Sequence, residues 1–150
     1  MSKWFLGMMV FMACVSVRAN SFELGILVGD PTGISALMDI EPNRAVDMAI
    51  GGSARGTHVH ADYLLFQPGI IRSNQQFTPV LYYGVGGRVI HINSEPRKDQ
   101  TSLALRLPVG LNQIFAHDKI NFFIELSGNM DLVPAFNFDF DVGLGVRFKF

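Results

Sequence analysis

The chain has 150 residues, of which 49% are hydrophobic and 17% are charged, and its formal net charge is −1. A chain of this length fits one domain, or one domain with a targeting segment. The near-neutral charge excludes a strongly basic nucleic-acid-binding protein and a charged disordered tail. The mean hydropathy is +0.27, so a membrane-embedded segment has to be considered first.

Residues 1–19 have the pattern of a secretory signal peptide. Lys3 supplies a positive charge ahead of an apolar stretch at residues 4–15, and Ala19 is a small residue at the expected cleavage site. The apolar stretch is shorter than the roughly 20 residues that a membrane-spanning helix needs. Two alternatives stay open, an uncleaved membrane anchor and a lipoprotein signal that is acylated at Cys14.

From residue 20 onward, apolar and polar residues alternate in the two-residue period of β-strands. In the last segment, every even position from Phe138 to Phe150 holds a large apolar residue, with charged residues or glycine between them. Eight such segments are separated by turn-forming stretches at residues 29–33, 41–43, 53–56, 67–76, 93–101, 115–118 and 133–137. Strands of this kind are long enough to cross a lipid bilayer at a tilt.

The charged residues avoid the apolar faces of these segments. After residue 19, no Asp, Glu, Lys or Arg falls on an apolar face, and the charges within the segments share the other face with glycines. This exclusion is typical of a lipid-facing surface, where a charge costs roughly 2–4 kcal/mol at the bilayer midplane. The polar face is then expected to line a narrow lumen that side chains fill. Pro108 falls on the polar face within a strand, where it removes a donor from the ladder; a local bulge would accommodate it, but the sequence does not predict one.

The polar face predicts a network of paired charges that fills the lumen and leaves no large constitutive pore. The predicted lumen network is Glu23, Asp39, Asp47, His60, Asp62, Arg88, Arg106, Glu125, Asp131, Asp139, Asp141, Arg147 and Lys149. Loss of one member, for example by Arg106→Ala, is expected to destabilise the barrel because it leaves buried charges unpaired.

A metal site and the active site of a lipid-modifying enzyme are the two alternatives to this network. His58, His60 and Asp62 alternate on one strand face, a spacing that can place zinc or copper ligands side by side. Membership of the lumen network is the favoured interpretation, so no metal and no cofactor are predicted. A lipid-modifying enzyme needs converging serine, histidine and acid groups. His91 is the histidine expected on the lipid side, and no serine or acid clearly partners it in the sequence, so no enzyme activity is predicted.

The last six residues resemble a recognition signal. A terminal aromatic residue, Phe150, follows Phe148 by two positions and Gly145 by five. This pattern is similar to the signal by which the barrel-assembly machinery recognises outer-membrane proteins, and it implies that machinery as a partner.

Several segments along the chain resemble motifs of the small OmpA-like outer-membrane β-barrel proteins. They are Asp30–Ser35, His60–Leu64, Leu81–Arg88, Leu107–Gly110 and Asp131–Pro134. The segment Leu81–Arg88 is the most specific of them. Leu37 departs from the family pattern, which usually has a polar or basic residue there. The resemblance implies a bare eight-stranded barrel without an established enzyme activity.

The sequence therefore predicts an all-β protein, an eight-stranded antiparallel transmembrane barrel at residues 20–150 that follows a cleaved signal peptide. The expected location is the bacterial outer membrane, with both ends of the barrel periplasmic. The expected role is structural or in surface interactions, as a monomer in contact with outer-membrane lipid and not with nucleic acid. The alternatives are a small ion or solute channel, a lipid-modifying enzyme and a soluble lipocalin-like barrel; the charge pattern argues against the last.

Overall fold

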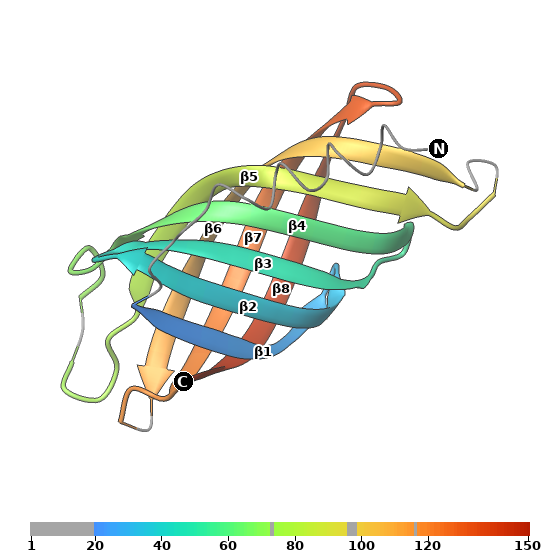
Figure 1. The fold of residues 1–150 in the computed structure, drawn as a ribbon. Helices are drawn as coiled ribbons and strands as arrows, with labels where there is room; N and C mark the ends of the chain where they lie inside the picture. Colours follow the sequence, from blue (N-terminus) through green and yellow to red (C-terminus); the bar gives the residue numbers. More distant parts are fainter. Residues whose placement is uncertain (1–19, 73, 96–98, 116) are drawn as a thin grey trace.

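Eight antiparallel strands form one closed barrel in the computed structural model, which describes residues 20–72, 74–95, 99–115 and 117–150. The strands are β1 (Ser21–Gly29), β2 (Thr32–Glu41), β3 (Arg44–Gly52), β4 (Gly56–Gln67), β5 (Val80–Ile92), β6 (Gln100–Phe115), β7 (Ile120–Val133) and β8 (Asn137–Lys149). Each strand pairs with the next along the chain, and β1 pairs with β8 to close the ring (Figure 1). The predicted eight-stranded antiparallel barrel is confirmed. The predicted signal peptide at residues 1–19, with Cys14, lies outside the described residues.

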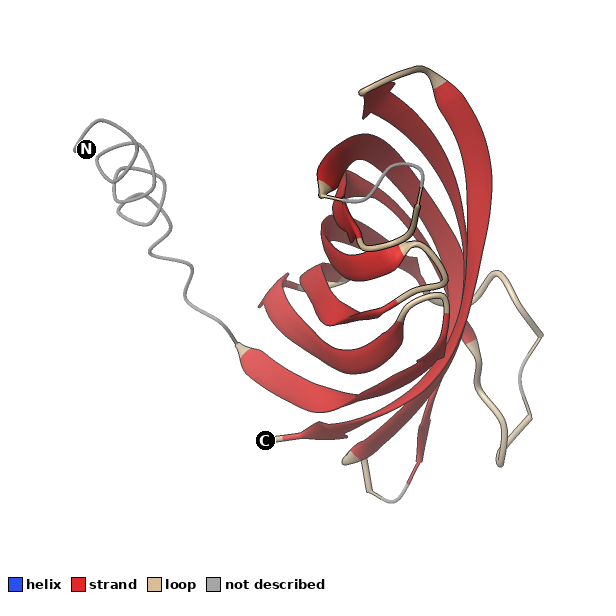
Figure 2. Cartoon of the chain, turned by 90° about the vertical axis from the view of Figure 1, so that its right-hand side faces the viewer, coloured by secondary structure: helices blue, strands red, loops and turns tan. Residues whose placement is uncertain are grey.

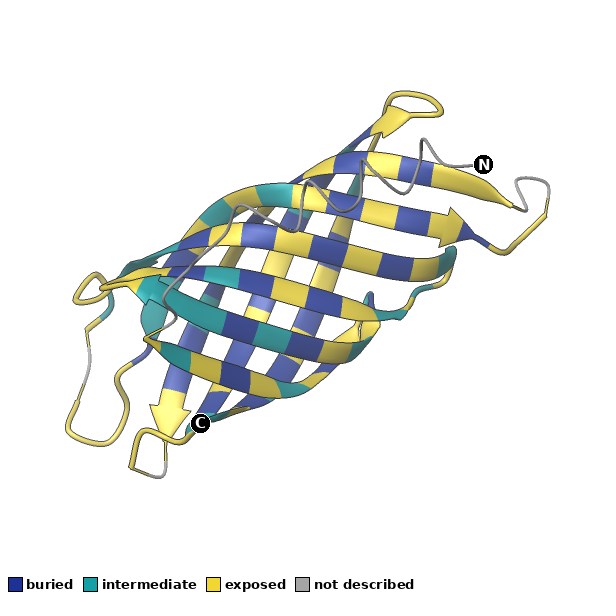
Figure 3. Cartoon of the chain, viewed as in Figure 1, coloured by how far each residue is buried: buried dark blue, intermediate teal, exposed yellow. Residues whose placement is uncertain are grey.

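The burial pattern follows the alternation in the sequence. Along β6, buried residues alternate with exposed ones from Ser102 to Gly110, and Figure 3 shows the same banding on the neighbouring strands. The outward positions hold large apolar side chains, and three of them, Phe136, Phe138 and Phe140, are 73–75% exposed. The barrel therefore has an apolar exterior.

The two ends of the barrel differ. The terminal end carries Asn20 and Phe150 together with the β2–β3, β4–β5 and β6–β7 connections, and the distal end carries the other connections (Figure 1). Figure 2 shows that strands and the loops between them account for the described chain. In these described residues, no helix is long and apolar enough to span a membrane.

The β4–β5 connection is the longest in the barrel and extends beyond the predicted turn at residues 67–76. β5 begins only at Val80. The side-chain Oδ1 of Asn74 accepts hydrogen bonds from the backbone N–H groups of Gln76 and Phe77, which holds a turn in that segment. Pro79 has no N–H to donate to a strand ladder, so the pairing starts after it.

Pro108 lies within β6, and neither ladder of this strand has a bulge beside it. The β6–β7 register runs through Pro108 unbroken, and the shift in that ladder lies between Leu103 and Ala104. The β5–β6 ladder keeps the same register on both sides of the proline, with Tyr83 opposite Val109 and Gly86 opposite Arg106. The two positions in between, opposite Pro108 and Leu107, are not paired. A gap in one ladder therefore accommodates the missing N–H of proline.

An apolar layer lies inside the barrel beside the charged groups. It consists of Leu27, Leu37, Ala45, Ala49, Leu64, Tyr82 and Phe123, with Phe66 packed against it. This layer adds apolar side chains to the filled polar lumen that the sequence predicts. Leu37 is only 2% exposed within it, so its apolar side chain fills volume without needing a hydrogen-bond partner.

Candidate functional site

The predicted lumen network lies on the inner face of the barrel. Its buried members are Glu23, Asp47, His60, Asp62, Arg88, Arg106, Glu125, Asp131, Asp141 and Arg147. The other three lie closer to the ends of the barrel, where the side chains of Asp39, Asp139 and Lys149 are 26–32% exposed. The network divides by its contacts into a distal cluster, a central cluster and a group at the terminal end.

The distal cluster consists of Arg55, Arg88, Asp131, Asp139 and Asp141. The guanidinium of Arg88 donates through Nη1 to Oδ1 of Asp139 at 2.9 Å and to Oδ2 of Asp141 at 3.0 Å. Its Nη2 donates to Oδ1 of Asp131 at 2.8 Å. Arg88 therefore joins β5 to β7 and β8 across the barrel, and one planar cation pairs with three carboxylates from two strands.

Arg55 completes the distal cluster and is absent from the predicted network. It lies in the β3–β4 connection, and its Nη2 donates to Oδ2 of Asp139 at 2.6 Å while Nη1 donates to Oδ2 of Asp131 at 3.1 Å. The sequence does not predict this contact. The alternation of apolar and polar residues indicates the inner face only within strands, and Arg55 lies in a turn. Asp30, in the β1–β2 turn, faces the same charges: burial raises the pKa of its carboxyl, and the negative charge of Asp141 raises it further.

The central cluster is built around Arg106 on β6. Its Nη2 donates to Oε1 of Glu125 at 2.6 Å, and its Nη1 contacts the carboxylate of Asp62. The hydroxyl of Tyr82 donates to the other oxygen of Glu125 at 2.8 Å. These side chains are at most 5% exposed, so each charge depends on its partners in place of water.

Arg147 on β8 makes a second set of contacts in the middle of the barrel. Its Nη2 donates to Oδ1 of Asp47 at 2.6 Å, and its Nε donates to the hydroxyl of Ser35 at 2.8 Å. The guanidinium also lies 3.8 Å from the centre of the Phe123 ring, a cation–π contact with the apolar layer. Phe123 was not predicted as a lumen residue, although its odd-numbered position on β7 puts it on the inner face.

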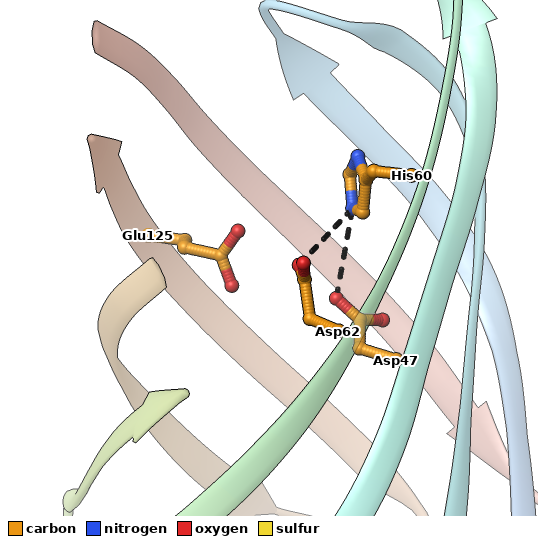
Figure 4. A group of neighbouring side chains, drawn as sticks. All are labelled: Asp47, His60, Asp62 and Glu125. Carbon is orange, nitrogen blue, oxygen red and sulfur yellow. Dashed lines mark ion pairs between the residues drawn. The ribbon is translucent and has the colours of Figure 1, made fainter. Parts of the chain in front are cut away.

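The candidate metal ligands stay close together in the structure, but His58 is not part of the group whose atoms could surround one ion. Nε2 of His58 lies 3.1 Å from Nδ1 of His60, so His58 contacts the other histidine. Oxygen and nitrogen atoms of His60, Asp62, Asp47 and Glu125 lie within 4.8 Å of one another (Figure 4). His60 Nε2 is 3.8 Å from a carboxylate oxygen of both Asp47 and Asp62. The group with metal-ligand geometry thus includes two carboxylates that the sequence spacing did not suggest.

These carboxylates are already paired with guanidinium groups. Arg106 pairs with Asp62 and Glu125, and Arg147 pairs with Asp47. A divalent cation at this position would lie beside two fixed positive charges, which opposes its binding. The arrangement is better suited to a hydrogen-bonded charge network than to a metal centre.

The remaining predicted residues are His91 and the three residues of the C-terminal pattern, of which Gly145 lies on the inner face and the others are exposed. The side chain of His91 is 50% exposed, and its Nε2 is 4.0 Å from Oδ1 of Asp99. His91 therefore has an acidic neighbour that the sequence did not indicate. Phe148 and Phe150 are 45% and 74% exposed, and their rings pack edge to face at 5.3 Å. Gly145 faces inward, where a Cβ would collide with the ring of Phe123.

A scan of the sequence against protein-family models, a search of curated proteins and a search of solved structures each found no match. Functional conclusions about this chain therefore depend on its own residues and geometry.

Proposed function

We propose that the chain is an integral outer-membrane β-barrel protein with a filled lumen and a structural or surface-interaction role. The observation that carries the proposal is the exterior of the barrel. Outward positions at mid-strand hold side chains such as Ile26, Ile50, Leu107, Ile124 and Leu144, which are 50–61% exposed. A water-soluble protein rarely exposes a continuous apolar surface of this extent, whereas a transmembrane barrel requires one.

The resemblance to small OmpA-like barrels and the expected signal peptide agree with this proposal. Eight is an even number of strands, so both ends of the barrel chain lie at its terminal end, which we assign to the periplasm. Under this assignment the long β4–β5 connection is periplasmic, although the longer loops of such barrels usually face outward.

The interior argues against a constitutive pore. Arg88 and Arg106 each bridge carboxylates across the barrel, and both side chains are at most 3% exposed. A channel would need these pairs to open, so we expect no large stepwise conductance from the folded protein in planar bilayers. Frequent large single-channel openings would instead favour the channel alternative.

The location is tested by fractionating cells and following the migration of the protein on a gel with and without heating. A folded outer-membrane barrel sediments with membranes and migrates differently once heat unfolds it. A protein that stays in the soluble periplasmic fraction and shows no heat-dependent shift would overturn the proposal.

The orientation is tested with single cysteines, because residues 20–150 contain none. Ala135→Cys places a thiol in the β7–β8 turn at the distal end, and Gln75→Cys places one in the β4–β5 connection. On intact cells, a membrane-impermeant maleimide should label the first variant and not the second. The reverse pattern would invert the assignment while leaving the barrel in the membrane.

A further inference from the structure

A cavity of about 320 Å³ opens at the terminal end of the barrel; we term it the terminal cup. Residues that line it include Glu23, Leu37, Asp39, Glu41, Phe66 and Asn112. Glu23, Leu37 and Asn112 are 2–6% exposed and form its floor, while Glu41 is exposed at the rim. The cup is thus a blind recess with a buried polar and apolar base.

The carboxylates of the cup differ in how they are neutralised. Lys149 also lines the cup and is the β8 neighbour of Glu23 in the ladder, but its ammonium lies 3.7 Å from Asp39; Glu41 lies 3.0 Å from Arg44 at the rim. Glu23 is buried, and the amide of Asn121 donates a hydrogen bond to its carboxylate at 2.8 Å. Glu23 is therefore a buried carboxylate that has a hydrogen bond but no cation within ion-pair distance among the described residues.

A second observation concerns a neighbouring acceptor. The Oδ1 atom of Asn112 is buried and has no hydrogen-bond partner among the described residues, and the Asn112 side chain is part of the lining of the cup. Oδ1 of Asn121, beside Glu23, is also without a partner there. At or beside the floor of the cup, two buried amide oxygens therefore have no donor among the described residues, and Asn112 presents its oxygen close to apolar side chains.

We propose that the terminal cup binds small molecules that carry a primary ammonium group. The ammonium donates to the Glu23 carboxylate and to Asn112 Oδ1, which supplies the missing cation and a missing donor together. Leu37 and Phe66 then contact a short aliphatic portion of the ligand. These apolar walls favour an organic cation over a hydrated metal ion, and the carboxylates disfavour an anion.

The proposal is tested by calorimetric titration of the purified folded barrel in detergent with n-butylammonium. Tetramethylammonium is the matched probe, because it has the same charge but no N–H to donate. We expect saturable binding of n-butylammonium and at least about tenfold weaker binding of tetramethylammonium, the scale of one charge-assisted hydrogen bond.

Protein variants test whether the ligand binds at the floor of the cup or at its rim. Glu23→Gln should weaken binding of n-butylammonium at least about tenfold, whereas Glu41→Gln, at an exposed and already paired position, should change it by less than about twofold. Asn112→Leu tests the same floor if Glu23→Gln fails to fold, and heat-dependent gel migration checks the fold of each variant.

Three results would each overturn the proposal: no saturable binding, equal affinity for the two ammonium probes, or equal losses in the floor and rim variants. Displacement of n-butylammonium by calcium at equal concentration would also overturn it, because it would identify a metal site. A binding failure leaves the membrane assignment intact, since that assignment depends on cell fractionation and gel migration.

Discussion

Replacement of Arg106 by methionine tests whether the paired charges hold the barrel together. Methionine keeps much of the length of the side chain and removes its charge and its donors. Asp62 and Glu125 would then lose the guanidinium that contacts both of them. Glu125 would keep the hydroxyl of Tyr82 as a donor.

The expected loss in the free energy of unfolding depends on how deeply these three side chains are buried. The side chain of Arg106 is 3% exposed, and those of Asp62 and Glu125 are 0% and 5% exposed. Removal of one partner from a buried ion pair usually lowers the free energy of unfolding by about 3–5 kcal/mol, because a charge is left without compensation. We expect a loss in this range at neutral pH.

The assay is urea unfolding of the barrel refolded into phospholipid vesicles, followed by circular dichroism and heat-dependent gel migration. Tryptophan fluorescence is unsuitable because the single tryptophan, Trp4, lies in the expected signal peptide. The control is the triple variant Arg106→Met, Asp62→Asn, Glu125→Gln, in which no unpaired charge remains. It should recover most of the lost stability.

A loss below about 1 kcal/mol in the single variant would refute the reasoning, because that is the scale of a solvent-screened surface pair. A triple variant no more stable than the single one would refute it as well. In that case the cost would come from packing or from lost hydrogen bonds, and unpaired charge would not be its source.

Two further substitution pairs test the outer face and the glycine positions. Leu126→Arg at the middle of β7 should lower unfolding stability in vesicles by roughly 2–4 kcal/mol, and Leu132→Arg near the end of the same strand by about 1 kcal/mol or less. Equal losses at both depths would argue against a bilayer around the barrel. Gly110→Ala should lower stability by about 1–3 kcal/mol, because its Cβ would lie 2.5 Å from the Tyr82 ring. Gly128→Ala, whose Cβ meets its nearest neighbour at 3.7 Å, serves as the control and should be close to neutral in the same unfolding measurement.

The strand pattern was predictable from the sequence because one face of each strand is apolar. In β8, the alternation from Phe138 to Phe150 determines which side chains face inward, and the turn-forming residues between strands determine the order of pairing. The predicted turns therefore agree closely with the observed connections. The β4–β5 loop is the exception, since the chain there forms a turn at Asn74 before Pro79 delays the ladder.

The partners within the lumen were not predictable in the same way. Alternation indicates which face of a strand a residue occupies, but not its position along the barrel axis. The contacts of Arg88 with Asp131 and Asp141 across the lumen could therefore not be predicted from the sequence. Arg55 reaches the same aspartates from a turn, where no periodicity exists. Apolar lumen residues such as Phe123 were not predictable from alternation, because Phe123 stands between two other apolar residues, Phe122 and Ile124.

The pairing of β1 with β8 determines the order in which the barrel can be assembled. The backbone N–H of Phe150 donates to the carbonyl of Phe22 at 2.9 Å, so the residue that follows β8 meets one of the first residues of the barrel. A chain that stops before β8 would leave the edges of β1 and β7 open. In a lipid environment each unpaired backbone group at those edges costs several kcal/mol. If the barrel spans a membrane as proposed, stable insertion therefore requires all eight strands, and a product truncated before β8 is not expected to persist as a smaller barrel.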